Sequence, residues 1–329
     1  MGHILITRPM RNLLLLGGSG FVGRATCAEL VEHAGGGGLT LAVPTRRARN
    51  ARPLRHLPGM EIIETDVGRD DAALAGLVAG RDAVVNLVAI LHGDAGRFEQ
   101  VHVELPRRLA RACRDAGVRR LVHVSALGVG PDSPSLYLRS KTAGEAVLRE
   151  AGLDLTLLRP SVIFGAEDRL TNLFASLQRL LPLLPLGGAG ARFQPVWVCD
   201  VARAIVQCLH RPDTIGQTYE CTGPQVLTLA ELVRLAGRHA GCARPVLPLP
   251  GPLASLQALA MELLPGEPLM SRDNLRSLQV PNVATGKLPG LTALGIEPAS
   301  MDAVLPSYLG PQRGGSARLN PLRTRAHRD

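Results

Sequence analysis

The chain has 329 residues, 46% of them hydrophobic and 20% charged, so it suits one enlarged α/β domain or a domain with a smaller partner. Its net charge is +9, but much of the excess lies in an arginine-rich C-terminus, and no aromatic-interleaved basic patch is present. We therefore expect no nucleic-acid binding. The six cysteines are widely spaced and form no C-x-x-C pair, which predicts reduced thiols in a cytoplasmic protein.

No apolar stretch predicts a membrane-spanning helix, which needs about 20 residues. The most leucine-rich stretch, 170–186, is interrupted by Gln178, Arg179 and two prolines, and the apolar run Leu13–Leu16 is too short for a secretion signal. We expect a cytoplasmic protein that is either soluble or peripheral on the inner face of the cytoplasmic membrane. The oligomeric state stays open.

Short aliphatic runs alternate with longer segments of helical period through the first 160 residues, a pattern typical of βα units around a parallel sheet. We predict strands near 12–16, 39–43, 60–64, 83–88, 120–125 and 153–158. The helices between them are predicted near 20–33, 70–79, 97–116 and 134–151. Later elements are predicted as a helix at 170–181, a helix capped by Asp200, a returning strand at 217–222 and several short helices over 225–309.

The strand ending at Leu16 runs directly into the segment GGSGFVG, and a helix follows. This context makes the glycine pattern a dinucleotide-binding fingerprint. Gly17 permits the tight turn, Gly20 lets the backbone approach the pyrophosphate, and Gly23 lets the helix pack on the strand. The helix N-terminus then faces the phosphates with unpaired N–H groups. We assign to this site Gly17, Gly18, Ser19, Gly20, Phe21, Val22 and Gly23.

The fold class predicted from these patterns is α/β, a Rossmann-type doubly wound parallel sheet with a small, mostly helical C-terminal substrate lobe. The predicted parts are an extension at 1–9, a NAD(P)-binding domain at 10–165, a lobe at 166–309 whose strand returns to the main sheet, and a basic flexible tail at 310–329.

The end of the second strand lacks the acidic residue with which NAD-preferring domains hold the adenosine ribose. Arg46 and Arg47 stand there instead, and their guanidinium groups can bind a 2′-phosphate. NADP(H) is therefore favoured over NAD(H), with a solvated basic loop as the alternative. Further cofactor contacts are predicted after the third and fourth strands, at Asp66, Val67, Val88 and Ala89. For Asp66, the alternative is a helix cap.

Tyr137 and Lys141 lie four residues apart in a segment of helical period, so both side chains project from one face. A lysine beside a phenol stabilises the phenolate, so we expect the pKa of Tyr137 to fall from about 10 towards neutrality. The tyrosine would then exchange a proton with a carbonyl or alcohol while hydride moves to or from the nicotinamide. His102 and His123 have no carboxylate or cysteine at metal-ligand spacing, so we interpret them as structural and predict no metal.

These features resemble the short-chain dehydrogenase/reductase superfamily, in its extended or atypical branch. The motifs that carry the resemblance are GGSGFVG, VHVSALG (122–128), YLRSK (137–141), LLRPSVIFG (157–165) and PVWVCDVARAI (195–205). Three segments resemble bacterial relatives of the nicotinamide-binding accessory subunit of mitochondrial respiratory complex I: RPSVIFGAEDRLTNLF, SRDNLRSL (271–278) and LGIEPASMDAVLPSYL (294–309).

The resemblance implies that Tyr137 is the acid/base, that Lys141 binds the nicotinamide ribose and that Ser125 lies near the substrate oxygen. Extended members often place the working hydroxyl two residues later, where this chain has Leu127, so a hydrogen-bonded strand-end serine is the alternative for Ser125. Backbone along the nicotinamide is implied at Pro160, Val162 and Phe164.

Two functions of different kinds are consistent with the sequence. The first is an NADP(H)-dependent oxidoreductase acting on a small or lipophilic, quinone-like carbonyl or alcohol, which the Tyr137 and Lys141 pair favours. The second is a non-catalytic NADPH-binding accessory or assembly subunit of a respiratory or quinone-biosynthetic membrane complex, which the resemblance favours. A nucleotide-sugar epimerase or dehydratase comes third, because the lobe shows little of the polar, arginine-anchored character expected for a diphosphate sugar.

Overall fold

The computed structural model describes residues 10–35, 37–263 and 270–310. By its contacts the chain divides into two compact units. The first comprises Met1–Pro160, Cys199–Cys221 and Gly286–Ile296, as far as these residues are described. The second comprises Ser161–Val198, Thr222–Thr285 and Glu297–Asp329, with the same restriction. The predicted extension at 1–9 and all of the predicted tail except Gly310 lie outside the described residues.

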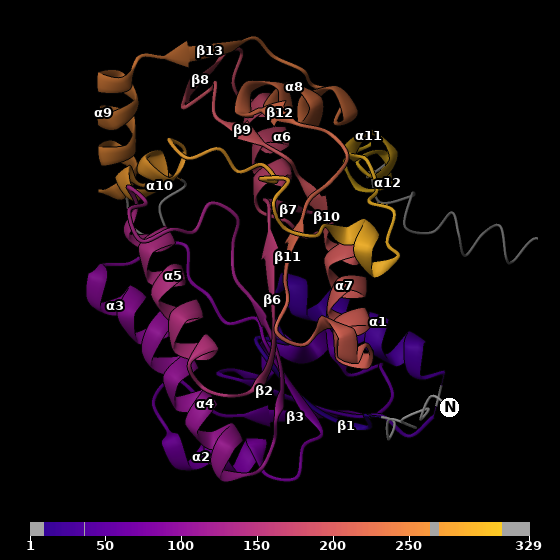
Figure 1. Cartoon of the computed structure of the whole chain (residues 1–329). Helices are drawn as coiled ribbons and strands as arrows, with labels where there is room; N and C mark the ends of the chain where they lie inside the picture. Colours follow the sequence, from indigo (N-terminus) through magenta and orange to yellow (C-terminus); the bar gives the residue numbers. More distant parts are fainter. Residues whose placement is uncertain (1–9, 36, 264–269, 311–329) are drawn as a thin grey trace, which may run out of the picture. The chain divides into compact units, whose positions relative to one another are not determined.

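A seven-stranded sheet forms the centre of the first unit, and every neighbouring pair of its strands is parallel (Figure 1). Its order is β11-β6-β5-β4-β1-β2-β3. The strands are β1 (Asn12–Leu16), β2 (Thr40–Thr45), β3 (Met60–Glu64), β4 (Ala83–Asn86), β5 (Arg120–Val124), β6 (Asp154–Pro160) and β11 (Thr218–Cys221). The order reverses between β1 and β4, where doubly wound sheets bind their ligands. The predicted Rossmann-type sheet is therefore confirmed.

Helices cover both faces of this sheet. They are α1 (Phe21–Ala34), α2 (Asp71–Val78), α3 (Ala95–Glu99), α4 (Leu105–Asp115), α5 (Leu136–Arg149) and α7 (Val198–His210), with short turns η1 (Ala48–Leu54), η2 (Gln100–Glu104), η3 (Pro212–Thr214) and η4 (Leu291–Leu294). Figure 1 shows α2, α4 and α5 on one side and α1 with α7 on the other. The last two touch through His33 and His210, whose rings are 4.5 Å apart.

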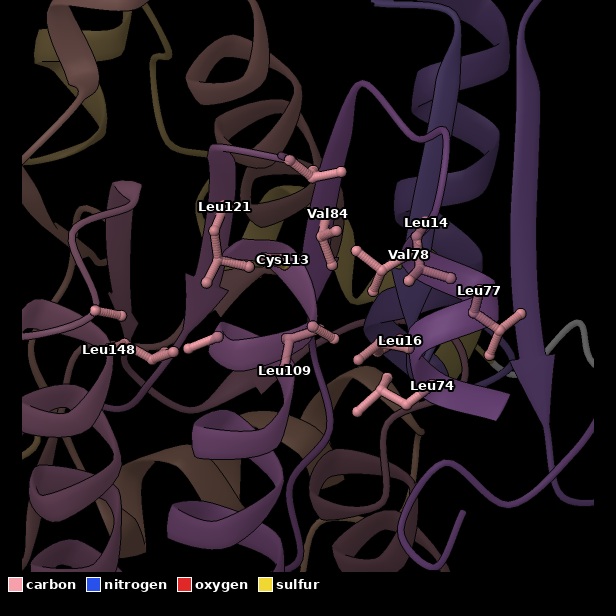
Figure 2. Packing of buried hydrophobic residues seen from close by; sticks show 14 of the residues in the cluster. Leu14, Leu16, Leu74, Leu77, Val78, Val84, Leu109, Cys113, Leu121 and Leu148 are labelled. Carbon is pink, nitrogen blue, oxygen red and sulfur yellow. The ribbon is translucent and has the colours of Figure 1, made fainter. Parts of the chain in front are cut away.

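The strands are aliphatic because helices bury them from both sides. Leu14 and Leu16 of β1 pack with Leu74 of α2 and Leu109 of α4, as Figure 2 shows. Alternate residues of a strand point to opposite faces, yet the whole run Leu13–Leu16 is fully buried. Each such leucine contributes about 1.5–3 kcal/mol when it leaves water, so this run strongly favours a central position for β1.

One expectation about helices is refined and another is wrong. The helix predicted over 97–116 is interrupted by η2, a wider π turn, because Pro106 has no N–H with which to continue the α-helical ladder. The helix expected to be capped by Asp200 already begins at Val198, since β10 runs directly into it. Asp200 therefore lies inside the first turn, and its Oδ1 is 3.2 Å from Nη1 of Arg203.

The second unit is built on α6 and α8, which pack against each other. Its helices are α6 (Leu170–Leu180), α8 (Leu229–His239), α9 (Gly251–Glu262), α10 (Arg272–Ser277), α11 (Met301–Val304) and α12 (Pro306–Leu309). Its short strands are β7 (Ile163–Phe164), β8 (Leu184–Gly187), β9 (Arg192–Phe193), β10 (Val196–Trp197), β12 (Leu227–Thr228) and β13 (Val246–Leu249). They pair as β7 with β10, β8 with β13 and β9 with β12. Runs this short were not predicted, because two to four residues carry too little period to identify a strand.

Candidate functional site

The glycine segment forms a tight turn between β1 and α1. Gly17 has a φ of +82°, and the N–H of Gly20 donates to its carbonyl at 3.0 Å. A Cβ placed on Gly23 would lie 2.3 Å from the Gly17 oxygen and 2.5 Å from Gly18, so only hydrogen fits there. The N-cap of α1 is Gly20, which has no side chain to cap the first-turn N–H groups. These donors, with Phe21 and Val22 in the first turn, suit an anion such as a pyrophosphate.

Two side chains fix this turn. The Oγ atom of Ser19 lies 3.1 Å from Oγ1 of Thr45, which ties the turn to the end of β2. The Nη1 of Arg24 donates to the Ser19 carbonyl at 2.8 Å. Sequence reasoning did not select Thr45 or Arg24. Their positions, at the end of β2 and one turn into α1, are the signal that would have found them.

Arg46 and Arg47 follow β2 directly, and both side chains are exposed. Neither forms an ion pair with another residue in the described part of the chain. The carboxylate nearby is Glu64, whose Oε2 accepts the N–H of Ala48 at 3.1 Å. The two guanidinium groups are thus available to an anionic group of a ligand.

Asp66 closes the turn that follows β3. Its Oδ1 accepts the N–H of Gly68 at 3.1 Å, and its Oδ2 is 3.8 Å from Nε of Arg69. The helix-cap alternative is wrong, because the N-cap of α2 is Asp70. Val67 packs against the core beneath the sheet. Contact of Asp66 with an adenine stays a prediction.

The loop after β4 lies against the glycine turn, since a Cβ on Gly17 would be 3.3 Å from the Val88 nitrogen. The N–H of Val88 donates to Oδ1 of Asn86 at 3.1 Å, and Nδ2 of Asn86 lies 3.1 Å from Nδ1 of His123. Ala89 is exposed. The backbone expected to pass the cofactor is therefore held by buried polar side chains below it.

Helix α5 carries the predicted acid–base pair, one helical turn apart, and Ser135 caps its N-terminus. Lys141 is only 2% exposed, and its Nζ donates to the Val124 carbonyl at 2.9 Å. The next residue, Ser125, is 5% exposed, and its Oγ has no hydrogen-bond partner among the described residues. A buried hydroxyl without a partner is unusual in a native protein, so a bound ligand is its expected partner.

The pKa values differ from those expected for a coupled pair. Burial raises the pKa of Tyr137 to about 12. Burial lowers the pKa of Lys141 to about 8, while the charge of Glu145 opposes this shift. The expected fall in the tyrosine pKa is not observed, because desolvation of the phenol dominates and the Lys141 ammonium is directed at a backbone carbonyl. Glu145 is itself fixed by Arg159, with N–O distances of 2.9 and 2.6 Å.

The residues predicted after β5 and β6 fall in both units. The N–H of Leu127 donates to the Pro160 carbonyl at 3.0 Å, and the Leu127 side chain is buried. Val162 and Phe164 belong to the second unit. The Val162 N–H donates to Oδ1 of Asn282 at 3.0 Å, and the Phe164 side chain is buried in the core of that unit.

No group of three or more histidine, cysteine, aspartate or glutamate side chains suited to a metal ion is found within residues 10–35, 37–263 and 270–310. None of the helices in these ranges is long and apolar enough to cross a membrane. All six cysteines are free thiols. The groups that could hold a ligand are thus the glycine turn, the arginine loop and the carboxyl ends of β4 and β5.

A family model described as NAD(P)H-binding matches residues 17–212, which include the glycine turn and helix α5. The chain belongs to the NAD(P)H-binding family. It is 33% identical over 299 residues to subunit 9 of the NADH dehydrogenase [ubiquinone] 1 alpha subcomplex, mitochondrial, from Mus musculus, covering 88% of this chain and 77% of that protein. This relationship confirms the resemblance to the complex I subunit. The glycine turn and the unpaired Ser125 hydroxyl fit a nicotinamide dinucleotide.

Two other comparisons concern an enzyme relative and a solved structure. The chain is 27% identical over 234 residues to an NAD(P)H azoreductase of Xenophilus azovorans, covering 71% of this chain and 75% of that protein. It also superposes on a dTDP-glucose 4,6-dehydratase from Streptomyces venezuelae, solved with NAD bound, with a TM-score of 0.70 and 24% identity. That match covers 94% of this chain and 99% of the dehydratase chain, and at this identity it shows the fold alone.

Proposed function

We propose that the protein is an NADP(H)-dependent oxidoreductase that acts on a carbonyl or alcohol of a small or lipophilic, quinone-like substrate. The observation that carries this proposal is the unpaired Ser125 hydroxyl, which follows the carbonyl that anchors Lys141. Ser125 directly follows β5, and Lys141 lies one helical turn from Tyr137 on α5. A hydroxyl, an amine and a phenol therefore belong to neighbouring elements at the carboxyl end of β5.

Each side chain has a distinct task in this proposal. When bound, NAD(P)H would supply a hydride, and its oxidised form NAD(P)+ would accept one. Tyr137 holds its proton at neutral pH because its pKa is about 12, so it is set to donate that proton to a carbonyl oxygen during reduction. Ser125 donates a hydrogen bond to the same oxygen and orients it. Lys141 binds the nicotinamide ribose, and its positive charge stabilises the tyrosinate that forms.

The test of this function is a direct assay of turnover. The purified protein is mixed with NADPH and a panel of quinones, ketones and aldehydes, and the absorbance of NADPH is followed. The name of the azoreductase relative, an NAD(P)H enzyme, supports the expectation of turnover. Mass spectrometry of the denatured protein would identify any compound that co-purifies with it.

The coenzyme preference is expected to depend on Arg46 and Arg47. NADPH should bind at least about tenfold tighter than NADH, a difference of about 1.4 kcal/mol that one charge-assisted phosphate contact supplies. Arg46→Ala with Arg47→Ala should remove this preference, while Arg111→Ala, an exposed arginine on α4, should keep it. Isothermal calorimetry with both coenzymes measures it, and equal affinities in the wild-type protein would rule out the preference.

A second candidate function is a cofactor-stabilised accessory protein that docks at a membrane. The observation that favours it is a set of exposed leucines on α9 and its neighbours in the second unit. They are Leu180, Leu181, Leu183, Leu247, Leu253, Leu256, Leu259 and Leu263. Helix α9 packs on β8, where Nε2 of Gln257 donates to the Pro185 carbonyl at 3.1 Å, and β8 pairs with β13. Membership of the mouse relative in an NADH dehydrogenase supports this candidate.

Membrane docking predicts flotation with anionic liposomes at low salt. The electrostatic contribution to liposome binding should depend on the basic residues 311–329. Deleting them should therefore make binding weaker and less sensitive to salt. The hydrophobic contribution to liposome binding should depend on α9, so Leu253→Gln with Leu256→Gln should reduce binding at every salt concentration. Ile215→Gln, an exposed apolar residue of the first unit, is the matched control. A full-length protein that stays with the soluble fraction at low salt would contradict the docking.

A further inference from the structure

His102 is a buried imidazole to which the proposed chemistry assigns no task. It lies in the π turn η2 and is 3% exposed. Its ring stacks on Phe98 at a centroid distance of 5.5 Å and meets the ring of Tyr137 edge-on at 5.5 Å. It therefore touches the side chain that we place at the centre of proton transfer.

Both ring nitrogens of His102 bond to elements that flank the site. Nε2 accepts the N–H of Ile90, at the end of the loop after β4, at 3.1 Å. Nδ1 lies 2.8 Å from Oγ of Ser140, and that hydroxyl donates to the Tyr137 carbonyl at 2.8 Å. Since the Ser140 proton is used in this way, Nδ1 must carry the imidazole proton and donate it to Ser140. One neutral tautomer satisfies the entire chain from Ile90 to Tyr137.

The protonation state of His102 agrees with this chain. Burial lowers the pKa of His102 to about 3, and the charge of Lys141 lowers it further. The imidazole is therefore neutral in the physiological range. An imidazolium would point an N–H at the N–H of Ile90, and the link would be lost.

The backbone around His102 is also built for close contact with α5. A Cβ on Gly144 would lie 1.9 Å from the His102 carbonyl oxygen, so glycine alone lets α5 approach the π turn this closely. The π turn arises where Pro106 interrupts the helical ladder, and such turns often occur at functional sites. The loop after β4 and the helix carrying the acid–base pair thus meet on one side chain.

We propose that His102 is a positioning residue that couples the coenzyme loop, residues 87–90, to the acid–base helix α5. The roles of the loop and of α5 rest on the proposed function, but the hydrogen-bonded link between them is a property of the fold. Ordering of the loop by a dinucleotide is transmitted through the Ile90 amide, the imidazole and Ser140 to the backbone of Tyr137. His102 contacts neither hydride nor substrate.

Two substitutions separate the ends of this link. His102→Gln places an amide oxygen near the Nε2 position and keeps an acceptor for the Ile90 N–H, but it loses the hydrogen bond to the Ser140 hydroxyl. His102→Asn places its side-chain amide near the Nδ1 position and keeps the hydrogen bond to Ser140, but it loses the hydrogen bond from the Ile90 N–H. Ser140→Ala removes the helix end only and is matched to His102→Gln.

The experiment measures amide hydrogen exchange of the wild-type protein and these variants, with and without NADPH, together with NADPH affinity by calorimetry. In the wild-type protein NADPH should protect amides 87–90 and 137–141 together. His102→Gln and Ser140→Ala should keep the loop protected and lose protection of the helix. His102→Asn should speed exchange at Ile90 and weaken NADPH binding by about tenfold, the effect expected for one buried unsatisfied amide.

The outcomes distinguish the coupling from the proposed function. Where turnover is measurable, His102→Gln and Ser140→Ala should lower kcat by at least about tenfold at saturating NADPH, with coenzyme affinity nearly unchanged. If all three variants merely lower Tm while protection and affinity stay as in the wild-type protein, His102 is structural and the proposal is overturned. A protein that binds NADPH and shows the coupled protection but turns over no substrate overturns the oxidoreductase function and leaves the coupling standing.

Discussion

Tyr137→Phe is expected to abolish turnover, with a loss in kcat of about 10²–10⁴ that is typical of removing a positioned acid or base. The substitution removes the proton and keeps the ring, so the edge contacts with Phe98 and His102 should persist. Affinity for NADPH should change little, because the phenol is not needed to hold the coenzyme. Following NADPH absorbance and coenzyme binding in parallel tests both statements.

Lys141→Arg is also expected to lower turnover. It keeps a positive charge but replaces a compact ammonium with a wide planar fork. The Lys141 side chain is almost fully buried and its Nζ is fixed on the Val124 carbonyl, so the larger group cannot occupy the same position. Turnover should fall, although the chain uses arginine at nearly every other basic position.

The matched control for these variants is Tyr219→Phe. Tyr219 is a buried tyrosine on β11 of the same sheet, so its loss of a hydroxyl should leave turnover unchanged. Turnover by Tyr137→Phe near the wild-type rate would remove the tyrosine from the mechanism. If no substrate is turned over, and both site variants still support the growth or respiratory function of a deletion strain, the accessory role is correct.

Gly23→Ala is expected to remove coenzyme binding, raising the Kd for NADPH by more than about 100-fold, a change of about 2.7 kcal/mol. The added methyl would lie 2.3 Å from the Gly17 oxygen and 2.5 Å from Gly18, so the turn must open and α1 must move away from the strand. Overpacking of this kind also destabilises the fold by about 1–3 kcal/mol. Calorimetry measures the affinity, and thermal unfolding measures the stability.

Two further glycine variants separate binding from folding. Gly20→Ala meets only the Gly17 oxygen, at 3.2 Å, and has a backbone conformation that alanine adopts, so it should fold and still weaken NADPH binding through its methyl group. Gly76→Ala, on the exposed side of α2 with nothing within 4 Å, should bind normally. If Gly20→Ala and Gly23→Ala both fold and bind NADPH as the wild-type protein does, the pyrophosphate does not rest on this turn.

Local sequence determined the elements of the first unit and the position of its nucleotide turn. A run such as Leu13–Leu16 can be satisfied only between two layers of helices, and a glycine segment directly after it restricts the turn to one kind. The i, i+4 spacing of Tyr137 and Lys141 likewise follows from helical geometry alone. These features depend only on neighbours in the chain.

Tertiary structure decided which groups meet and how they titrate. The Lys141 contact with Val124 spans 17 positions and the His102 contact with Ser140 spans 38, and no local period encodes such pairs. The pKa of Tyr137 was expected to fall but rises, because burial of the phenol is a property of the packed molecule. The sequence alone therefore determined the sheet and the turn, whereas the electrostatics of the site arise only when distant segments come together and exclude water.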